Sequence, residues 1–223
     1  MHFEVPKAST FKEFGGEYLM IVISILTALG LEHGAQAMHH RHLAHQASQN
    51  IDAEIRANIA ELTAVRAHNK AEQDNKIALR DALLAEIQSG ASDAALRTNL
   101  KSHYASVFRI SLQTPTLRRE AWDVAVANQA VSWMPPDQLK RYSVIYAGMR
   151  DLQALVATGA GSFMDGPRMQ DAKSNVEMGG ADPRETYRML NQVVASFGNL
   201  NGNLRNLQSE LEQGSSAPAP TEH

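Results

Sequence analysis

The chain has 223 residues, a formal net charge of −3 and no cysteine. This length suits one domain with a hydrophobic core, and a slightly acidic chain without a basic face is not expected to bind nucleic acid. Aromatic residues make up only 6% of the chain. Together with abundant alanine, this is typical of helices that pack through small and aliphatic side chains.

The first predicted element is a stretch of fourteen uncharged residues, Tyr18–Leu31. A helix rises about 1.5 Å per residue and the hydrocarbon layer is about 30 Å thick, so roughly 20 residues are needed to cross it. With its flanking residues the stretch predicts a transmembrane anchor over residues 14–37, preceded by a short tail over residues 1–13. Glu17 and Glu32 would then lie near the two headgroup layers.

Two alternatives to an anchor remain. Ala35-Gln36-Ala37 has the small-x-small form of a signal-peptidase site, so the first alternative is a signal peptide cleaved after Ala37. The second alternative is a buried hydrophobic helix. An uncleaved anchor is favoured because the basic residues of the leader are outnumbered by its glutamates. Lys7 and Lys12 precede the span, whereas only Arg41 lies in the twenty residues after His33. This bias predicts a single-pass inner (plasma) membrane protein with a cytoplasmic N-terminus and a periplasmic or extracytoplasmic C-terminal domain.

The residues after the anchor show helical periodicity throughout. We therefore predict an all-α fold in which the transmembrane helix continues into an antiparallel helical bundle over residues 38–212. Polar residues 69–76 predict a break or an exposed turn, and Ser89-Gly90 ends the next apolar stripe. Thr114-Pro115 combines an N-cap hydroxyl with a proline at the first helical position, so a helix is expected to begin there. Pro135-Pro136 predicts the start of another helix.

The glycine-rich residues 158–181 predict an irregular connector, and Asp182 with Glu185 resembles a capping box for the last helix. That helix carries apolar residues at the a and d positions of three heptads, and it therefore needs a partner surface. The apolar stripe Ile51–Val65 is the nearest candidate, and a second subunit is the alternative. Residues 213–223 predict a disordered tail. The heptad residues are Leu190, Val193, Phe197, Leu200, Leu204, Leu207 and Leu211.

Five of the nine histidines lie close together just after the predicted span. On a helix, His39, His42 and His45 fall within one sector, whereas His33 and His40 share another face. Imidazoles three residues apart can bind zinc, copper or nickel, so the first three are a candidate metal site. Protonation would also make this region positive next to anionic headgroups. The simpler interpretation is an amphipathic helix with a histidine-rich polar face.

Catalytic patterns are absent from the sequence, and neither an enzyme activity nor a cofactor is predicted. The run Gly159-Ala160-Gly161-Ser162 lacks the Gly-Lys-Ser/Thr ending of a nucleotide loop and does not match the nucleophile turn Gly-x-Ser-x-Gly. Four aromatic residues could line a ligand pocket, but aromatic residues at helical spacing more often form the core. These four are Trp122, Trp133, Tyr142 and Tyr146.

The opening Thr10-Phe11-Lys12-Glu13-Phe14, followed by Glu17 and the apolar run 21–29, resembles a large group of bacterial single-pass inner-membrane proteins that have no assigned activity. The middle of the chain is similar as well, with Ala121-Trp122 followed by Tyr142-Ser143-x-x-Tyr146. The resemblance covers the first 65 residues and about 115–155. It implies an inner-membrane protein with an exported helical domain. It implies no activity.

These observations predict a membrane-tethered helical interaction or scaffold module. Its expected partners are the lipid bilayer and either a second copy of the chain or another membrane protein. The small-residue pairs Gly30-x-x-x-Gly34 and Ser24-x-x-x-Ala28 would allow close helix approach in lipid. The alternative is an extracytoplasmic domain that senses a ligand, a metal or pH and acts through a partner.

Overall fold

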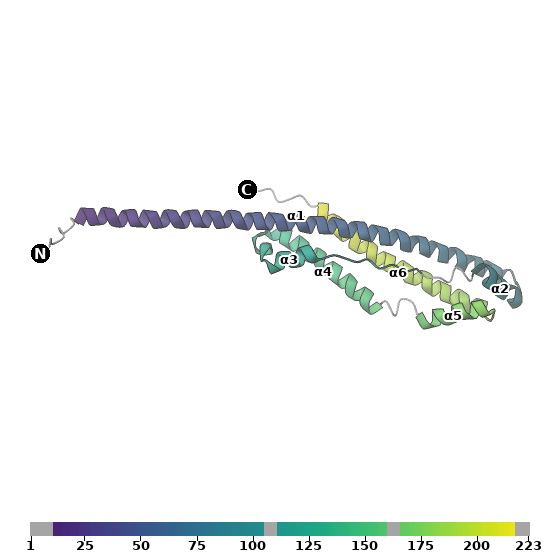
Figure 1. Ribbon diagram of the computed structural model, residues 1–223. Helices are drawn as coiled ribbons and strands as arrows, with labels where there is room; N and C mark the ends of the chain where they lie inside the picture. The colour runs from purple at the N-terminus through teal and green to yellow at the C-terminus, as the bar shows by residue number, and fades with distance from the viewer. Residues whose placement is uncertain (1–10, 105–110, 160–165, 217–223) are drawn as a thin grey trace, which may run out of the picture.

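The computed structural model describes residues 11–104, 111–159 and 166–216. Every element within these ranges is helical, which confirms the prediction of an all-α fold (Figure 1). In chain order the elements are α1 (Phe11–Gln88), α2 (Asp93–Asn99), the π-helix η1 (Leu100–Tyr104), α3 (Glu120–Ala127), the 3-10 helix η2 (Ala130–Trp133), α4 (Pro136–Gly159), α5 (Gly166–Met178) and α6 (Pro183–Ser216).

Helix α1 is a single column of 78 residues, and the other elements pack along its C-terminal part (Figure 1). The predicted break at residues 69–76 is wrong, because α1 continues through them and two of their polar residues, Asn69 and Lys76, face the bundle. Asn69 is fully buried, and Lys76 is 3% exposed with its ammonium 3.3 Å from the carboxylate of Glu72. The helix ends at Gln88, and Gly90 follows with a φ of 78°, which confirms the predicted stop at Ser89-Gly90.

Helix α6 runs back along α1 and supplies its main packing partner (Figure 1). All seven heptad residues of α6 are buried. The described residues form two hydrophobic clusters. The C-terminal half of α6 joins Ile51, Ile55 and Leu62 in the larger one, and Leu190 joins Leu79 and Leu83 in the smaller one. The heptads therefore pack on α1 of the same chain, and the contact surface extends beyond the predicted stripe.

An extended segment, residues 111–119, lies along α1 where a helix was predicted to begin at Thr114-Pro115. We call this segment the strap. The amide of Asn58 donates to the carbonyl of Arg118 and accepts from its N–H, at 2.8 and 2.9 Å. Asn69 makes the same pair of bonds with Gln113, also at 2.8 and 2.9 Å. Because α1 satisfies these backbone groups, the chain remains extended and α3 begins only at Glu120.

The remaining boundaries are partly as predicted. Helix α4 begins at Pro136 as expected, but it continues to Gly159, and α5 lies within the predicted connector 158–181. Asp182 caps α6 by accepting from the N–H of Arg184 at 2.8 Å. The carboxylate of Glu185 instead pairs with Arg168 and Arg188, so its expected bond back to the cap is replaced by ion pairs.

Candidate functional site

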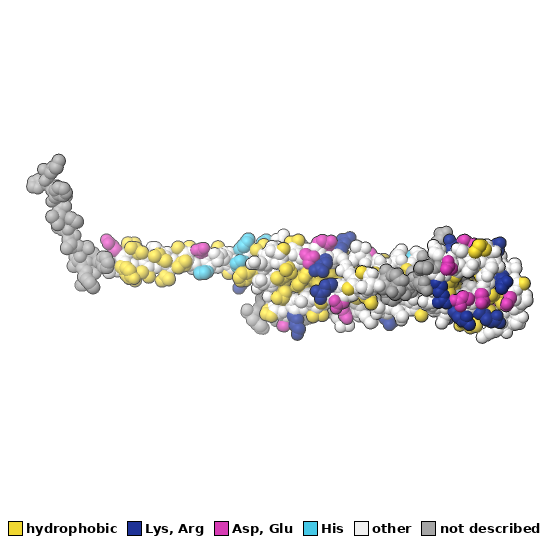
Figure 2. All heavy atoms as spheres, turned by 90° about the horizontal axis from the view of Figure 1, so that it is seen from below, with side chains coloured by type: hydrophobic (Ala, Val, Ile, Leu, Met, Phe, Trp, Pro, Cys, Tyr) yellow, Lys and Arg dark blue, Asp and Glu magenta, His cyan; other side chains and the backbone are white. Residues whose placement is uncertain are grey.

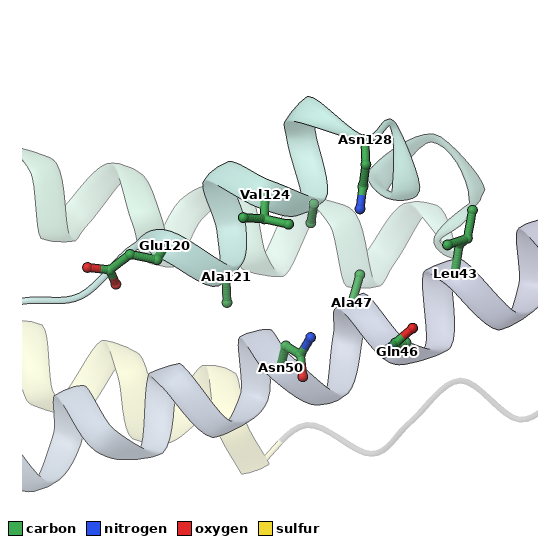
Figure 3. Close-up of a pocket in the computed structure, with 9 residues that line it drawn as sticks. Leu43, Gln46, Ala47, Asn50, Glu120, Ala121, Val124 and Asn128 are labelled. Atoms are coloured by element: carbon green, nitrogen blue, oxygen red, sulfur yellow. The ribbon is translucent and has the colours of Figure 1, made fainter.

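A groove of about 390 Å³ separates α1 from α3 (Figure 3). Leu43, Ala47 and Ala121 contribute apolar surface, and Val124 stands 60% exposed beside them. In Figure 3 the side chains of Ala121 and Asn128 point across the groove toward α1. Amide and carboxylate groups complete its wall, from Gln46, Asn50, Glu120 and Asn128. Such a surface suits an apolar side chain with hydrogen-bonding groups around it.

The groove keeps its shape because a buried carboxylate of α1 holds α3 in place. Glu54 is 9% exposed, and its Oε2 accepts from the N–H of Ala121 in the first turn of α3 at 2.9 Å. The other oxygen accepts from the hydroxyl of Tyr146 at 2.5 Å. A carboxylate at a helix N-terminus is stabilised both by free N–H groups and by the helix dipole. Glu54 therefore acts as a tertiary cap for α3.

A second tyrosine on α4 repeats this link one turn away. The hydroxyl of Tyr142 donates to Asp52 at 2.8 Å and accepts from Gln138 at 3.0 Å. The guanidinium of Arg141 lies 4.0 Å from the same carboxylate. Burial raises the pKa of Tyr142 and of Tyr146, and the hydrogen bonds to Asp52 and Glu54 raise each further. Both hydroxyls are thereby kept protonated as hydrogen-bond donors.

The four aromatic residues considered as a pocket do not come together. Trp122 stacks on Tyr146 with ring centroids 5.1 Å apart, and Tyr142 is fully buried in the same cluster. Trp133 instead lies in η2, where it is 51% exposed and stacks on His40 at 3.8 Å. Tyr142 and Tyr146 are thus core residues, Trp122 packs partly buried against their cluster, and Trp133 is part of the surface.

The histidines follow α1 between the apolar run and the bundle (Figure 2). His39, His42 and His45 are exposed, and His45 contacts Gln49 at 3.0 Å. Within the described ranges no three His, Cys, Asp or Glu side chains are grouped so that they could hold a metal ion. The three histidines therefore remain a candidate from sequence alone. His40 differs from them, because its Nδ1 is buried without a hydrogen-bond partner.

The apolar run of α1 projects beyond the bundle as an exposed rod (Figures 1 and 2). By length and composition this part of α1 could cross a membrane, and none of its apolar window is buried by the rest of the protein. Tyr18, Ile21 and Leu26 are each more than half exposed. A core helix would be covered, so the interpretation as a buried hydrophobic helix is wrong for the fold of this chain, whereas an anchor and a signal segment both fit.

No protein-family model, curated protein or solved structure matches this chain.

The candidate nucleotide or nucleophile run begins at Gly159, the last residue of α4, and its remaining residues lie outside the described ranges. Sequence reasoning missed the groove, because Ala47 and Ala121 are ordinary helix residues that reveal a concave surface only once α1 and α3 are placed. It also missed Glu54, whose function as a cap depends on a residue 67 positions away.

Proposed function

We propose that this protein is a membrane-tethered helical interaction module, anchored in the inner membrane by one span and presenting its bundle on the extracytoplasmic side. The main support is the exposed apolar run of α1, which continues without interruption into the helix that organises both hydrophobic clusters. The run Tyr18–Leu31 holds eleven apolar side chains, and exposing them to water would be costly, since burial is worth about 25 cal/mol for each Å² of apolar surface. Lipid removes that cost.

The groove supports the interaction role. It combines apolar side chains with polar groups and lies at the end of the bundle nearest the apolar run. The extracytoplasmic part of another membrane protein could reach it there. The described residues of the groove offer no grouped metal ligands and only one carboxylate, from Glu120, so binding fits this surface better than catalysis.

Site-specific photocrosslinking in native membranes tests the proposal. A photoreactive residue at Val124 is expected to capture a membrane protein, whereas one at Val144 is not. Val144 is a matched control, because it is 58% exposed on α4 and does not line the groove. Carbonate extraction and sequencing of the mature N-terminus accompany it. A mature chain that begins at Met38 and is released by carbonate would contradict the anchor and leave the signal-peptide alternative.

A second candidate function is pH or metal sensing, which the histidine cluster and the unpaired Nδ1 of His40 favour. The ring of His40 stacks on that of Trp133, so a change at His40 would be felt by the end of the bundle. Titration of the purified protein from about pH 8 to about pH 5, with and without Zn²⁺, tests this role. An unchanged melting temperature and oligomeric state in all conditions would argue against it.

A further inference from the structure

The end of the bundle nearest the apolar run is depleted of negative charge. On α1, the nineteen residues between Glu32 and Asp52 contain five histidines and Arg41 but no carboxylate. The segment between Asp123 and Asp137, which covers the end of α3, all of η2 and the following turn, contains no charged residue. These two segments lie side by side, because His40 stacks on Trp133 with only 12° between the ring planes.

Exposed apolar groups gather on this end. Trp133 is 51% exposed and Val126 is 46% exposed, and Pro135 and Pro136 are exposed beside them. Figure 2 shows hydrophobic side chains over the part of the bundle that adjoins the rod. We call the surface of Val126, Trp133 and Pro135 the η2 surface. An exposed tryptophan beside neutral or cationic groups matches the composition of membrane interfaces, where the amphipathic indole is favoured.

We propose that the η2 surface rests on the headgroup layer of the same bilayer that α1 crosses, with Trp133 as its interfacial anchor. This inference depends on the proposed membrane span. It assigns the surface one occupant, a lipid interface, and it fixes how the bundle stands on the membrane. The groove beside α3 would then open just above the lipid surface.

The distances along α1 permit this contact. The fourteen-residue run covers about 21 Å of a hydrocarbon layer of about 30 Å, so about three residues are drawn in at each end and the hydrocarbon edge falls near Gly34. Glu32 then lies about 3 Å inside this edge, and its side chain reaches the headgroup layer by snorkelling. His40 then lies about 9 Å beyond the edge, and the headgroup layer is about 5–7 Å thick. Transmembrane helices tilt by about 20° on average. A tilt toward η2 lowers Trp133 by several ångströms, because packed helices stand about 8–10 Å apart.

The lipid interface explains the η2 surface better than a protein partner does. A protein-binding patch on one side of the bundle could lie at any height, whereas this one lies where the continuous helix must leave the membrane. The absence of carboxylates over both segments also suits contact with a membrane interface, because a carboxylate pressed against it would lose part of its hydration.

Depth-dependent fluorescence quenching of the full-length protein tests the proposal. The chain has two tryptophans, so Trp122→Phe leaves Trp133 as the only one, and Trp133→Phe leaves Trp122. Trp122 is a matched control, because it is partly buried against Tyr146 within the bundle. Each variant is reconstituted into vesicles of phosphatidylethanolamine and phosphatidylglycerol that contain lipid brominated near the top of the acyl chain. Circular dichroism checks that both variants keep their helicity.

We expect brominated lipid to reduce the emission of Trp133 by roughly half and to leave Trp122 nearly unchanged. If the protein floats with the vesicles and resists carbonate but both tryptophans are quenched equally and weakly, the proposed interfacial contact is overturned and the proposed membrane span is kept. Protein that does not float would overturn the span as well. If soluble acrylamide cannot reach Trp133 and brominated lipid does not quench it, another protein surface, such as a second copy, covers it, and the inference is wrong.

Discussion

Asn58 and Asn69 lie eleven residues apart on α1, and each side-chain amide pairs with both backbone groups of one strap residue. Eleven helical residues make three turns and rise about 16 Å, so both amides face the same side. Between Gln113 and Arg118 the extended chain also covers about 16 Å. The helix and the strap therefore share a register, in which two asparagines replace the neighbouring strand that an extended segment would otherwise need.

Replacing Asn58 with alanine is expected to lower the free energy of unfolding by about 2–3 kcal/mol. The substitution leaves the N–H and the carbonyl of Arg118 without partners, and each lost buried hydrogen bond costs about 1–3 kcal/mol. Urea unfolding of the full chain in detergent, followed by circular dichroism, measures the change. Asn75→Ala is the matched control, because Asn75 is exposed on the same helix. Equal effects of the two substitutions would show that the strap does not depend on Asn58.

The strap also shows where sequence reasoning stopped. The heptads of α6, the stop at Gly90 and the start at Pro136 were predicted correctly, because each depends on residues adjacent in the chain. Asn58 and Asn69 lie at steps of three and four residues from Ile55, Leu62 and Val65, so periodicity alone places them on the buried face, but it does not say what a buried amide would bind. Their hydrogen-bond partners are 60 and 44 residues away, and no local sequence pattern predicts that these side-chain amides bind backbone groups.

The candidate site was harder to predict than the fold for the same reason. Residues 69–76 were interpreted as a break because they are polar, yet Lys76 is buried with its charge paired to Glu72. Thr114-Pro115 has the composition of a helix start, but the bonds from α1 override that local preference. Trp133 and His40 are 93 residues apart, so only the fold brings them together at the end of the bundle.

Stability is expected to fall at alkaline pH because of the two buried tyrosines of α4. The pKa values of Tyr142 and Tyr146 are raised in the folded protein, whereas an unfolded tyrosine ionises near pH 10. Below about pH 10 both states keep these protons and the stabilisation is complete. Above it the unfolded chain releases protons that the folded chain retains, so the free energy of unfolding falls by at most about 1.4 kcal/mol per pH unit for each tyrosine.

Urea unfolding between about pH 9 and about pH 11 measures this slope. Tyr146→Phe should reduce the slope, and the double substitution with Tyr142→Phe should reduce it further. At neutral pH, Tyr146→Phe should itself cost about 1–3 kcal/mol, since the buried carboxylate of Glu54 loses a donor. Wild-type and double-variant slopes that coincide would show that other groups cause the alkaline loss.

Leu204→Ala is expected to destabilise the bundle by about 2–5 kcal/mol, because Leu204 is fully buried between α6 and α1. Leu155→Ala should cost less than about 1 kcal/mol, since that side chain is 40% exposed on α4. Thermal unfolding compares the two variants. Because the heptads pack within one chain, the midpoint should not depend on protein concentration. A midpoint that rises steeply with concentration would indicate that α6 pairs between chains.

Two glycines of α6 should respond in opposite directions to alanine. At Gly202 a Cβ meets nothing within 4 Å, so Gly202→Ala should raise the free energy of unfolding by about 0.5–1 kcal/mol through helix propensity. At Gly214 a Cβ would lie 2.5 Å from Cδ1 of Ile145, whose side chain is buried on α4. The resulting overpacking should outweigh the gain in propensity and destabilise the protein by about 1 kcal/mol. Chemical denaturation of both variants tests whether α6 and α4 approach each other this closely. If Gly214→Ala stabilises the protein as much as Gly202→Ala does, the end of α6 does not pack on Ile145.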